Sequence, residues 1–340
     1  MANTAIKRVE IDLDKIKTQS EDDLFYFVDS NTAASERITA PRYSYWKSVF
    51  RIFFKKASNW IILSILLLLV VLSFVMPAIF PYDEYENILH TDWTNLTPWQ
   101  AFEVIGPDIR WILGTGRFGN SIFVGIWSAS RNSLILALVC AAINMVLGIA
   151  IGALWGYSKV LDGIFNVIYN IIANVPYLLL ISILVSVLGS SVFKDETGRF
   201  ISFIIALTIT GWLGIAYFFR NQVLIIRDRE YNLASRCLGT NIFRVVSKNV
   251  LPYLTSVIVT VLATEIPAYI GMEVYLTYIG IGLSAKTASI GHMINIAQDG
   301  WLTFPWPFWV PVFFSSVLTI SLYVMGQNLA DASDPRSHMQ

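Results

Sequence analysis

Side chains that could do chemistry occur in two settings in this sequence. The first is a charged segment, Arg227 to Pro252, which lies between two apolar runs and reads RDREYNLASRCLGTNIFRVVSKNVLP. Its basic residues can contact anionic groups, and its small and apolar residues favour contact with another surface. The second setting is inside the apolar runs, where polar residues are Asn144, Asn170, Asn174, Glu265 and Glu273. The charged segment suits docking to another surface, and the polar residues inside the runs suit passage of a ligand. Neither setting suggests catalysis.

The charged segment is predicted to contain two short helices separated by a glycine. Residues Glu230 to Leu238 form the first, and Gly239 ends it, since a glycine after a helix accepts the left-handed conformation. Asn241 is a good N-cap for the second helix, and Pro252 suits the opening of the next apolar run. The residues at helical spacing on one face of the first helix are Tyr231, Ala234, Ser235 and Leu238. From the residues alone, docking to a partner protein and anchoring on anionic lipid both remain open.

The elements that position these residues are apolar runs. The chain has 340 residues, of which 55% are hydrophobic and 14% charged, whereas soluble domains carry roughly 25% charged residues. Runs of about 20 apolar residues cross a hydrocarbon core as helices. Six such runs cover about residues 59–80, 132–155, 163–189, 200–219, 253–275 and 308–328. We therefore expect an all-α integral membrane protein with six transmembrane helices.

The flanking lysines and arginines set the orientation. Their excess before the first run and in the charged segment places both termini in the cytoplasm by the positive-inside rule. The charged segment, residues 227–252, then lies in the cytoplasm between spans four and five. Outer loops are expected at about residues 81–130 and 276–307. The expected domains are a polar cytoplasmic tail (1–41), a membrane domain (42–330) and a C-terminal cytoplasmic tail (331–340).

Several classes of function are disfavoured. The net charge is zero, which gives no electrostatic reason for nucleic-acid binding. Cys140 and Cys237 are predicted at different membrane depths, so we expect no disulfide, and the sequence has no metal-binding motif. No span holds a zinc-ligand pair or a Ser with a His, which disfavours an intramembrane enzyme. The chain also has no G-x-x-x-x-G-K-[ST] motif to hold nucleotide phosphates, so we expect neither catalytic residues nor a bound cofactor or metal.

The polar residues inside the runs are candidates for a substrate path, because such residues are costly in lipid. Asn174, Val175 and Pro176 predict a kink in the third run that would expose backbone to a cavity. For Asn144, Asn170 and Asn174 the alternative is a hydrogen bond between helices. Glu265 and Glu273 are expected to face protein or water.

The charged segment resembles the conserved cytoplasmic loop of importer-type ABC permeases. That loop has Glu-Ala-Ala, three residues, Gly, nine residues, two further residues and Leu-Pro. Here Leu233-Ala234-Ser235, Gly239 and Leu251-Pro252 keep the spacing. Leu233 stands where the family has Glu, so a salt bridge to the ATPase would fall to Arg229, Glu230 or Arg236.

Other motifs of the peptide-transporting branch follow in the same order. The matching residues are Leu113-Gly114-Thr115 with Gly119, Ala129 to Leu134, Glu273 with Leu276 and Ile279 to Gly282, and Asp331 with Asp334-Pro335-Arg336. The sequence departs from the branch where Gly116, Asn120 and Ser121 replace Asp, Arg and Asp. The resemblance spans about residues 42–336 and is nearest to the second permease subunit of oligopeptide importers in Gram-positive bacteria.

The resemblance implies the type I permease fold in the plasma membrane and ATP-driven alternating access. It implies several partners: a second permease subunit, two ATP-binding subunits that hold ATP and Mg²⁺, and an external peptide-binding lipoprotein. The implied ATPase-coupling residues are Arg229, Glu230, Tyr231, Leu233, Ala234, Ser235, Arg236, Leu238 and Gly239. Peptides would be the substrate, with dipeptides, nickel or signalling peptides as alternatives. A secondary transporter or a channel is the alternative class, but it would predict an inverted repeat and a charge relay that the sequence lacks.

Overall fold

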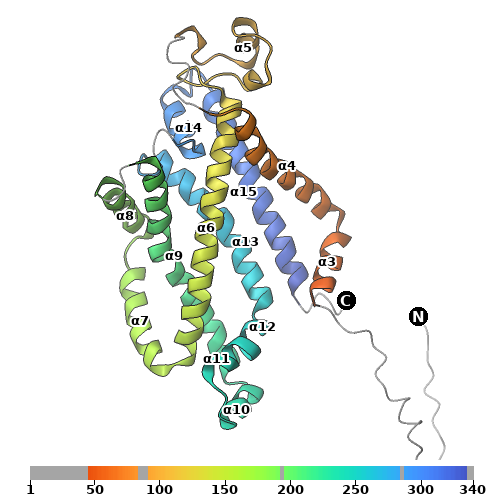
Figure 1. The fold of residues 1–340 in the computed structure, drawn as a ribbon, viewed down its shortest axis with the longest axis vertical. Coiled ribbons are helices and arrows are strands. Elements are labelled where there is room, and N and C mark those ends of the chain that lie inside the picture. Colours follow the sequence, from red (N-terminus) through yellow and green to blue (C-terminus); the bar gives the residue numbers. More distant parts are fainter. Residues whose placement is uncertain (1–44, 83–90, 192–194, 284–286, 335–340) are drawn as a thin grey trace, which may run out of the picture. The chain divides into compact units, whose positions relative to one another are not determined.

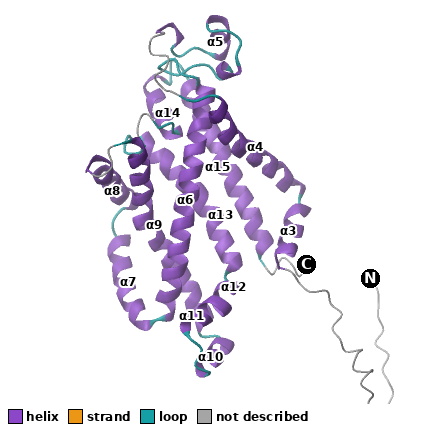
Figure 2. Cartoon of the chain, in the orientation of Figure 1, coloured by secondary structure: helices purple, strands orange, loops and turns teal. Residues whose placement is uncertain are grey.

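The computed structural model describes residues 45–82, 91–191, 195–283 and 287–334 of the chain. Within those ranges every regular element is a helix, apart from one isolated bridge between Thr115 and Ser121 (Figures 1 and 2). The predicted all-α architecture is therefore confirmed for the described part. The predicted tail 1–41 and residues 335–340 lie outside the described residues.

Five of the described helices are long and apolar enough to cross a membrane. They are α4 (Ala57–Ile79), α6 (Ile122–Tyr157), α9 (Glu196–Arg227), α13 (Thr255–Tyr278) and α15 (Trp306–Ser333). A short helix, α3 (Tyr45–Lys55), precedes α4. A sixth span exists if the bent pair α7 and α8 is counted as one.

The third predicted span is broken in the structure. Helix α7 (Lys159–Ala173) ends before Asn174, and α8 (Tyr177–Ser191) starts after Pro176, with an angle of 86° between them. Proline lacks the N–H that would continue the helix, and it disfavours helical geometry at the residue before it. The predicted kink is confirmed, and its size makes this a broken span or a re-entrant turn.

Helix α6 begins earlier than its hydropathy indicates. We predicted a start near residue 132, but the helix starts at Ile122, where the Ser121 hydroxyl accepts a hydrogen bond from the Val124 N–H at 3.2 Å. This first part carries Ser, Arg and Asn, which lower its hydropathy. Most of it is nevertheless buried inside the protein, where Ser130 donates to the Ile126 carbonyl at 2.7 Å. The predicted loop 81–130 therefore ends in helix.

Helices α6 and α9 pack closely because α6 carries glycine at every fourth position on one side. A methyl group at Gly148, Gly152 or Gly156 would meet α9, at 2.5 Å from the Ala216 carbonyl oxygen in the case of Gly152. Small residues at this spacing let two membrane helices approach to backbone contact. In the view of Figure 1 the other long helices, α13, α15 and α4, lie on one side of this pair, and the shorter α7 and α8 lie on the other.

Pro252 does not open the fifth span, contrary to the prediction. The second short helix, α11 (Ile242–Val245), runs into a π-helical turn, η4 (Val246–Val250), and then into the one-turn helix α12 (Leu251–Tyr253) that contains Pro252. The span itself, α13, begins at Thr255. The wider π turn keeps Val245, Val246, Val250 and Leu254 buried together against α9 and α6.

The two ends of the bundle differ in what they carry (Figure 1). At one end lie α5 (Pro98–Val104) and α14 (Ile290–Ala297), both within the predicted outer loops, with the 3-10 turns η2 (Thr91–Trp93), η3 (Ile109–Trp111) and η5 (Gln298–Gly300). At the other end lies α10 (Glu230–Cys237). We call these the α14 end and the α10 end.

Candidate functional site

The charged segment forms a tip at the α10 end. Helix α10 stops at Cys237, and Gly239 follows with φ of 75°. The Thr240 N–H donates to the Ser235 carbonyl at 3.1 Å, and the Gly239 N–H donates to the Arg236 carbonyl at 2.9 Å. These two bonds make a Schellman motif, so the predicted helix end at Gly239 is confirmed.

The tip presents apolar side chains that nothing in the described chain covers. Leu238 is 86% exposed and Phe243 is 67% exposed. The other exposed large apolar residues there are Tyr231, Leu233 and Ile242. Ala234 is exposed beside them, and Ser235, half-buried, donates to the Tyr231 carbonyl at 2.9 Å. The predicted face of α10 is therefore open for close contact with another surface.

Asn232 anchors α10 to the bundle. This buried role was not predicted from the sequence. Its side chain is fully buried; the amide donates to the Ile226 carbonyl at 2.9 Å, and its oxygen accepts from the Asn249 amide at 3.0 Å. These bonds join α10 to the last turn of α9 and to η4. A signal existed, because position 232 lies on the face of the predicted helix opposite Ala234.

The basic residues of the segment mostly contact their own chain. The Arg229 guanidinium lies over the Tyr253 ring at 5.8 Å, and that of Arg236 lies over Tyr157 at 5.6 Å. Both arginines and Glu230 are exposed, so they remain accessible. Hydrogen bonds from Arg227 lower the pKa of the Asp228 carboxyl.

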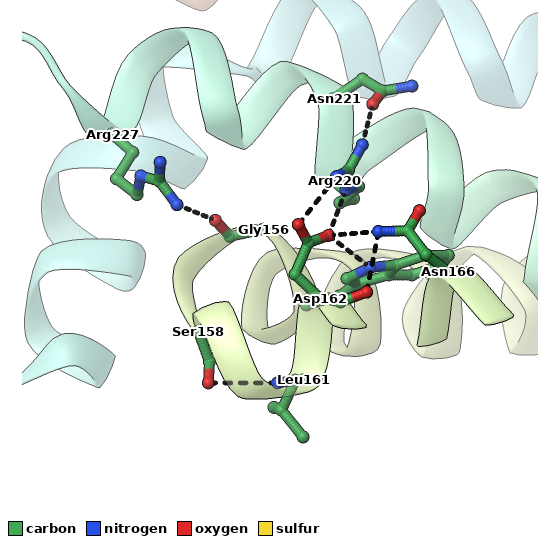
Figure 3. A network of polar contacts seen from close by, with 9 residues as sticks. Gly156, Ser158, Leu161, Asp162, Asn166, Arg220, Asn221 and Arg227 are labelled. Atoms are coloured by element: carbon green, nitrogen blue, oxygen red, sulfur yellow. Dashed lines mark hydrogen bonds and ion pairs between the residues drawn. The ribbon is translucent and has the colours of Figure 1, made fainter. Parts of the chain in front are cut away.

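A polar network joins α6, α7 and α9 close to this tip (Figure 3). Arg220 on α9 makes a two-point ion pair with Asp162 on α7, with Nε–Oδ1 at 2.7 Å and Nη2–Oδ2 at 2.9 Å. Asp162 Oδ1 also accepts from Trp155 at 2.9 Å and from Asn166 at 2.8 Å. The guanidinium lies 5.9 Å from the centres of the Trp155 and Tyr217 rings. The first turn of α7 is thereby held to α9 by paired charges and stacking.

A second contact ties the same region to the tip. Arg227, the last residue of α9, donates to the Gly156 carbonyl at the end of α6 at 3.0 Å (Figure 3). Neither this bond nor the Asp162–Arg220 pair was predicted from the sequence. The available signal was a pair of opposite charges beside apolar runs on one predicted side of the membrane.

A cavity of about 530 Å³ lies at the break between α7 and α8, against α9 and α13. Asn174 and Glu265 line it, with Tyr177 and Thr210 as further polar residues. The rings of Tyr169 on α7 and Tyr217 on α9 stack with centroids 4.1 Å apart. Two predicted path residues thus meet at one cavity, beside the helix that Asp162 clamps.

The other predicted path residues do not line this cavity. Asn144 is fully buried, and its amide donates to the Tyr269 hydroxyl at 2.5 Å and to the Leu207 carbonyl at 3.3 Å. The alternative reading of Asn144, a hydrogen bond between helices, is confirmed. Asn170 is exposed, and its carbonyl accepts from Asn174 at 2.5 Å. Asn144 reaches the cavity only through Tyr269, which is a lining residue.

Glu273 lies toward the α14 end and is fully buried. Its carboxylate oxygens accept from the hydroxyls of Ser133 at 2.6 Å, Ser289 at 2.5 Å and Thr277 at 3.2 Å. Glu273 therefore faces protein, one of the two surroundings expected for it. The contacts join α6, α13 and the residue before α14, which is a structural arrangement with no access for a substrate.

Comparisons with known proteins agree over nearly the whole chain. Residues 144–335 match the family model "Binding-protein-dependent transport system inner membrane component", and residues 44–98 match "N-terminal TM domain of oligopeptide transport permease C". The oligopeptide transport system permease protein AmiD of Streptococcus pneumoniae is 38% identical, over 92% of this chain and 97% of that protein. The dipeptide permease DppC of Bacillus subtilis is 31% identical, over 94% of each.

Two further likenesses are more distant. The oligopeptide permease OppC of Bacillus subtilis is 28% identical, over 90% of this chain and 95% of that protein. A chain from an inward-facing structure of the MetNI methionine ABC transporter has 17% identity and a TM-score of 0.48, over 62% of this chain and 95% of that one.

Proposed function

Because the chain belongs to the family of binding-protein-dependent transport system inner membrane components, we propose that it is one permease subunit of an ATP-driven oligopeptide importer. The observation that carries this proposal is the 38% identity to an oligopeptide permease over 92% of the chain. Dipeptides are the second candidate substrate, since a dipeptide permease is 31% identical over 94% of the chain. The family membership resolves the choice against a secondary transporter or a channel.

The uncovered tip at the α10 end supports docking to an ATP-binding subunit. Leu238 and Phe243 are exposed apolar residues on a segment that Asn232 fixes to the bundle. A rigid base with an open apolar face suits a protein partner. In this proposal the α10 end is cytoplasmic, both termini are cytoplasmic, and two ATP-binding subunits hold ATP and Mg²⁺.

The remaining partners follow from the same arrangement. A homologous permease subunit would complete the path beside the cavity of Asn174 and Glu265. An external peptide-binding lipoprotein would dock at the α14 end, and the complex would lie in the bacterial plasma membrane. The relatives from Streptococcus and Bacillus support a Gram-positive host.

The contacts of the tip suggest how its movement reaches the cavity. Asn232 joins α10 to the last turn of α9, and Arg227, at the end of α9, joins that helix to the end of α6. The Asp162–Arg220 pair then joins α9 to α7, the helix that ends beside Asn174 at the cavity. A push on α10 would move α7 with α9, which is the kind of rigid-body step that alternating access needs.

The first test is to purify the chain from its native membrane in mild detergent and to identify partners by mass spectrometry. We expect a second permease, ATP-binding subunits and a binding lipoprotein, and vesicles reconstituted with that complex should take up peptides in an ATP-dependent way. Recovery without any ATP-binding subunit, under conditions that preserve known complexes of this kind, would contradict the proposal.

The docking role of the tip is tested by a pair of variants at Gly239. Because its φ is 75°, Gly239→Val costs about 1–2 kcal/mol in the helix end, whereas Asn accepts this conformation. We expect Gly239→Val to reduce peptide uptake and the recovery of ATP-binding subunits, and Gly239→Asn to resemble wild type. Wild-type peptide uptake by Gly239→Val would contradict the docking role proposed for this turn.

A further inference from the structure

Helix α3 (Tyr45–Lys55), just before the first span, has a surface that the transport proposal does not use. Eight of its eleven residues fall in three parallel stripes, each with a spacing of four. The buried stripe is Val49 and Phe53, the exposed aromatic stripe is Trp46, Phe50 and Phe54, and the exposed basic stripe is Lys47, Arg51 and Lys55. The helix contains no acidic residue. Two of these three stripes are therefore exposed, one aromatic and one cationic, and they are adjacent.

The aromatic stripe continues onto the membrane-spanning helix α4. The ring centroids of Trp46 and Phe50 are 6.4 Å apart, those of Phe50 and Phe54 are 6.4 Å apart, and those of Phe54 and Trp60 on α4 are 4.8 Å apart. Trp60 is 53% exposed and begins the open apolar side of α4, which includes Ile61. The exposed aromatic side of α3 is thus continuous with a surface that faces lipid.

The angle between α3 and α4 is fixed by two side chains of α4. The Asn59 amide donates to the Phe53 carbonyl at 2.7 Å, and the Trp60 indole N–H donates to the Phe54 carbonyl at 3.1 Å. These carbonyls belong to the last turn of α3, where the helix itself supplies no partner. Asn59 is itself 1% exposed. Since both bonds cross the junction at Lys56, α3 is held against the start of α4.

We propose that α3 is an interfacial helix that binds the anionic lipid headgroups of the leaflet where α4 begins. Aromatic side chains favour the boundary between headgroups and acyl chains, and a neighbouring row of cations matches the phosphates above it. Lys56, at the junction itself, adds one more exposed cation. In the orientation given above this is the cytoplasmic leaflet, which is the anionic one. The inference does not depend on the transported substrate or on the ATP-binding subunits.

The test measures contact between α3 and lipid in the full-length chain. With Cys237→Ser as background, an environment-sensitive fluorophore is attached to Phe50→Cys, and the chain is reconstituted into phosphatidylcholine vesicles with or without phosphatidylglycerol. Lipids that carry a quencher near the headgroup report direct contact. A fluorophore at Phe243→Cys, on the exposed tip at the α10 end, is the matched control.

We expect quenching at Phe50→Cys that is at least severalfold stronger with phosphatidylglycerol, and little quenching at Phe243→Cys. Each basic residue near an anionic surface shifts such an equilibrium about fivefold. The combined change Lys47→Gln, Arg51→Gln and Lys55→Gln should therefore abolish the difference between the two lipid mixtures. Accessibility of native Cys237, restored in this variant, to a reagent that cannot cross the membrane checks that its topology is unchanged.

Three outcomes would overturn the proposal. Absence of lipid quenching at Phe50→Cys in both mixtures would mean that another surface covers α3. Protection of Phe50→Cys that appears only when ATP-binding subunits are added would make α3 a protein-docking site. Equal quenching in both mixtures that is also unchanged by the triple substitution would show that α3 does not bind anionic headgroups.

Discussion

The two ends of the helix bundle hold buried or partly buried carboxyl groups in different ways. Toward the α14 end, Glu273 is fully buried and accepts from three hydroxyls, with no cation beside it in the described residues. Toward the α10 end, Asp162 pairs with Arg220, and the two side chains are 30% and 15% exposed. The first site is closed, and the second is bordered by solvent and adjoins the exposed tip.

This difference indicates which end is built to move. A buried carboxylate with neutral donors cannot release them without leaving polar groups unpaired in a low-dielectric interior. A partly exposed ion pair can separate at lower cost than these fully buried contacts, since water can reach each charge. We infer that the Glu273 contacts keep α6, α13 and the start of α14 together. The Asp162–Arg220 pair makes α7 move with α9 while it is formed and lets the two helices separate when it breaks.

The largest predicted effect comes from removing the Glu273 carboxylate. Glu273→Ala leaves three buried hydroxyls without their acceptor and creates a cavity, so we expect a loss of about 3 kcal/mol in stability. Thermal unfolding of the purified chain in detergent, followed by tryptophan fluorescence, measures it. Glu273→Gln is the control, because its amide oxygen still accepts hydrogen bonds, and we expect a smaller loss. Wild-type stability in Glu273→Ala would mean that this end is not held together by the carboxylate.

The next effect concerns the anchor of the tip. Asn232→Ala leaves the Ile226 carbonyl and the Asn249 amide without this partner, which costs about 2 kcal/mol, or roughly thirtyfold in local opening. We expect limited trypsin digestion to cut at Arg229 and Arg236 correspondingly faster, while the midpoint of global unfolding shifts little.

Ser235→Ala is the matched control for this anchor. It removes a hydroxyl of α10 that bonds only to the Tyr231 carbonyl of the same helix, so digestion should proceed at the wild-type rate. If Asn232→Ala and Ser235→Ala are digested equally slowly, the tip does not depend on its buried amide. The contrast between the α14 end and the α10 end would then depend on the Asp162–Arg220 ion pair alone.

Much of the fold was predictable because lipid restricts the alternatives. Long apolar runs must be helices, so the spans followed from composition. The break followed from Asn174-Val175-Pro176, although Pro77, Pro267 and Pro311 lie inside unbroken helices. The start of α6 was not predictable from hydropathy, because Ser130 and its neighbours are polar in sequence but lie within the protein. Gly239 could be identified because a glycine directly after a predicted helix is the usual residue at its C-terminal end.

The candidate site was less predictable because its key contacts join distant parts of the chain. Asp162 and Arg220 are brought together by the packing of α6 against α9 through glycines, and no local pattern reports that pairing. Asn232 was hidden for a related reason: an asparagine in a charged helix suggests a surface position, and only its contacts with Ile226 and Asn249 make it an anchor. Glu273 was placed among path residues because buried charge in a span usually marks function.

The smallest predicted effect is the most direct comparison of the two ends. Arg220→Lys keeps the charge but loses the two-point pairing with Asp162 and the stacking on Trp155 and Tyr217, which costs about 1 kcal/mol at this partly exposed site. Hydrogen exchange should then show the first turn of α7 opening about fivefold more readily, with no change around Glu273. Arg227→Lys is the control, because Arg227 contacts Gly156 and Asp228 but not Asp162, so exchange in α7 should stay as in wild type. If Arg220→Lys leaves α7 unchanged, or if Arg227→Lys loosens it equally, the ion pair is not the releasable contact, and α7 is held to α9 by apolar packing such as the Tyr169–Tyr217 stack.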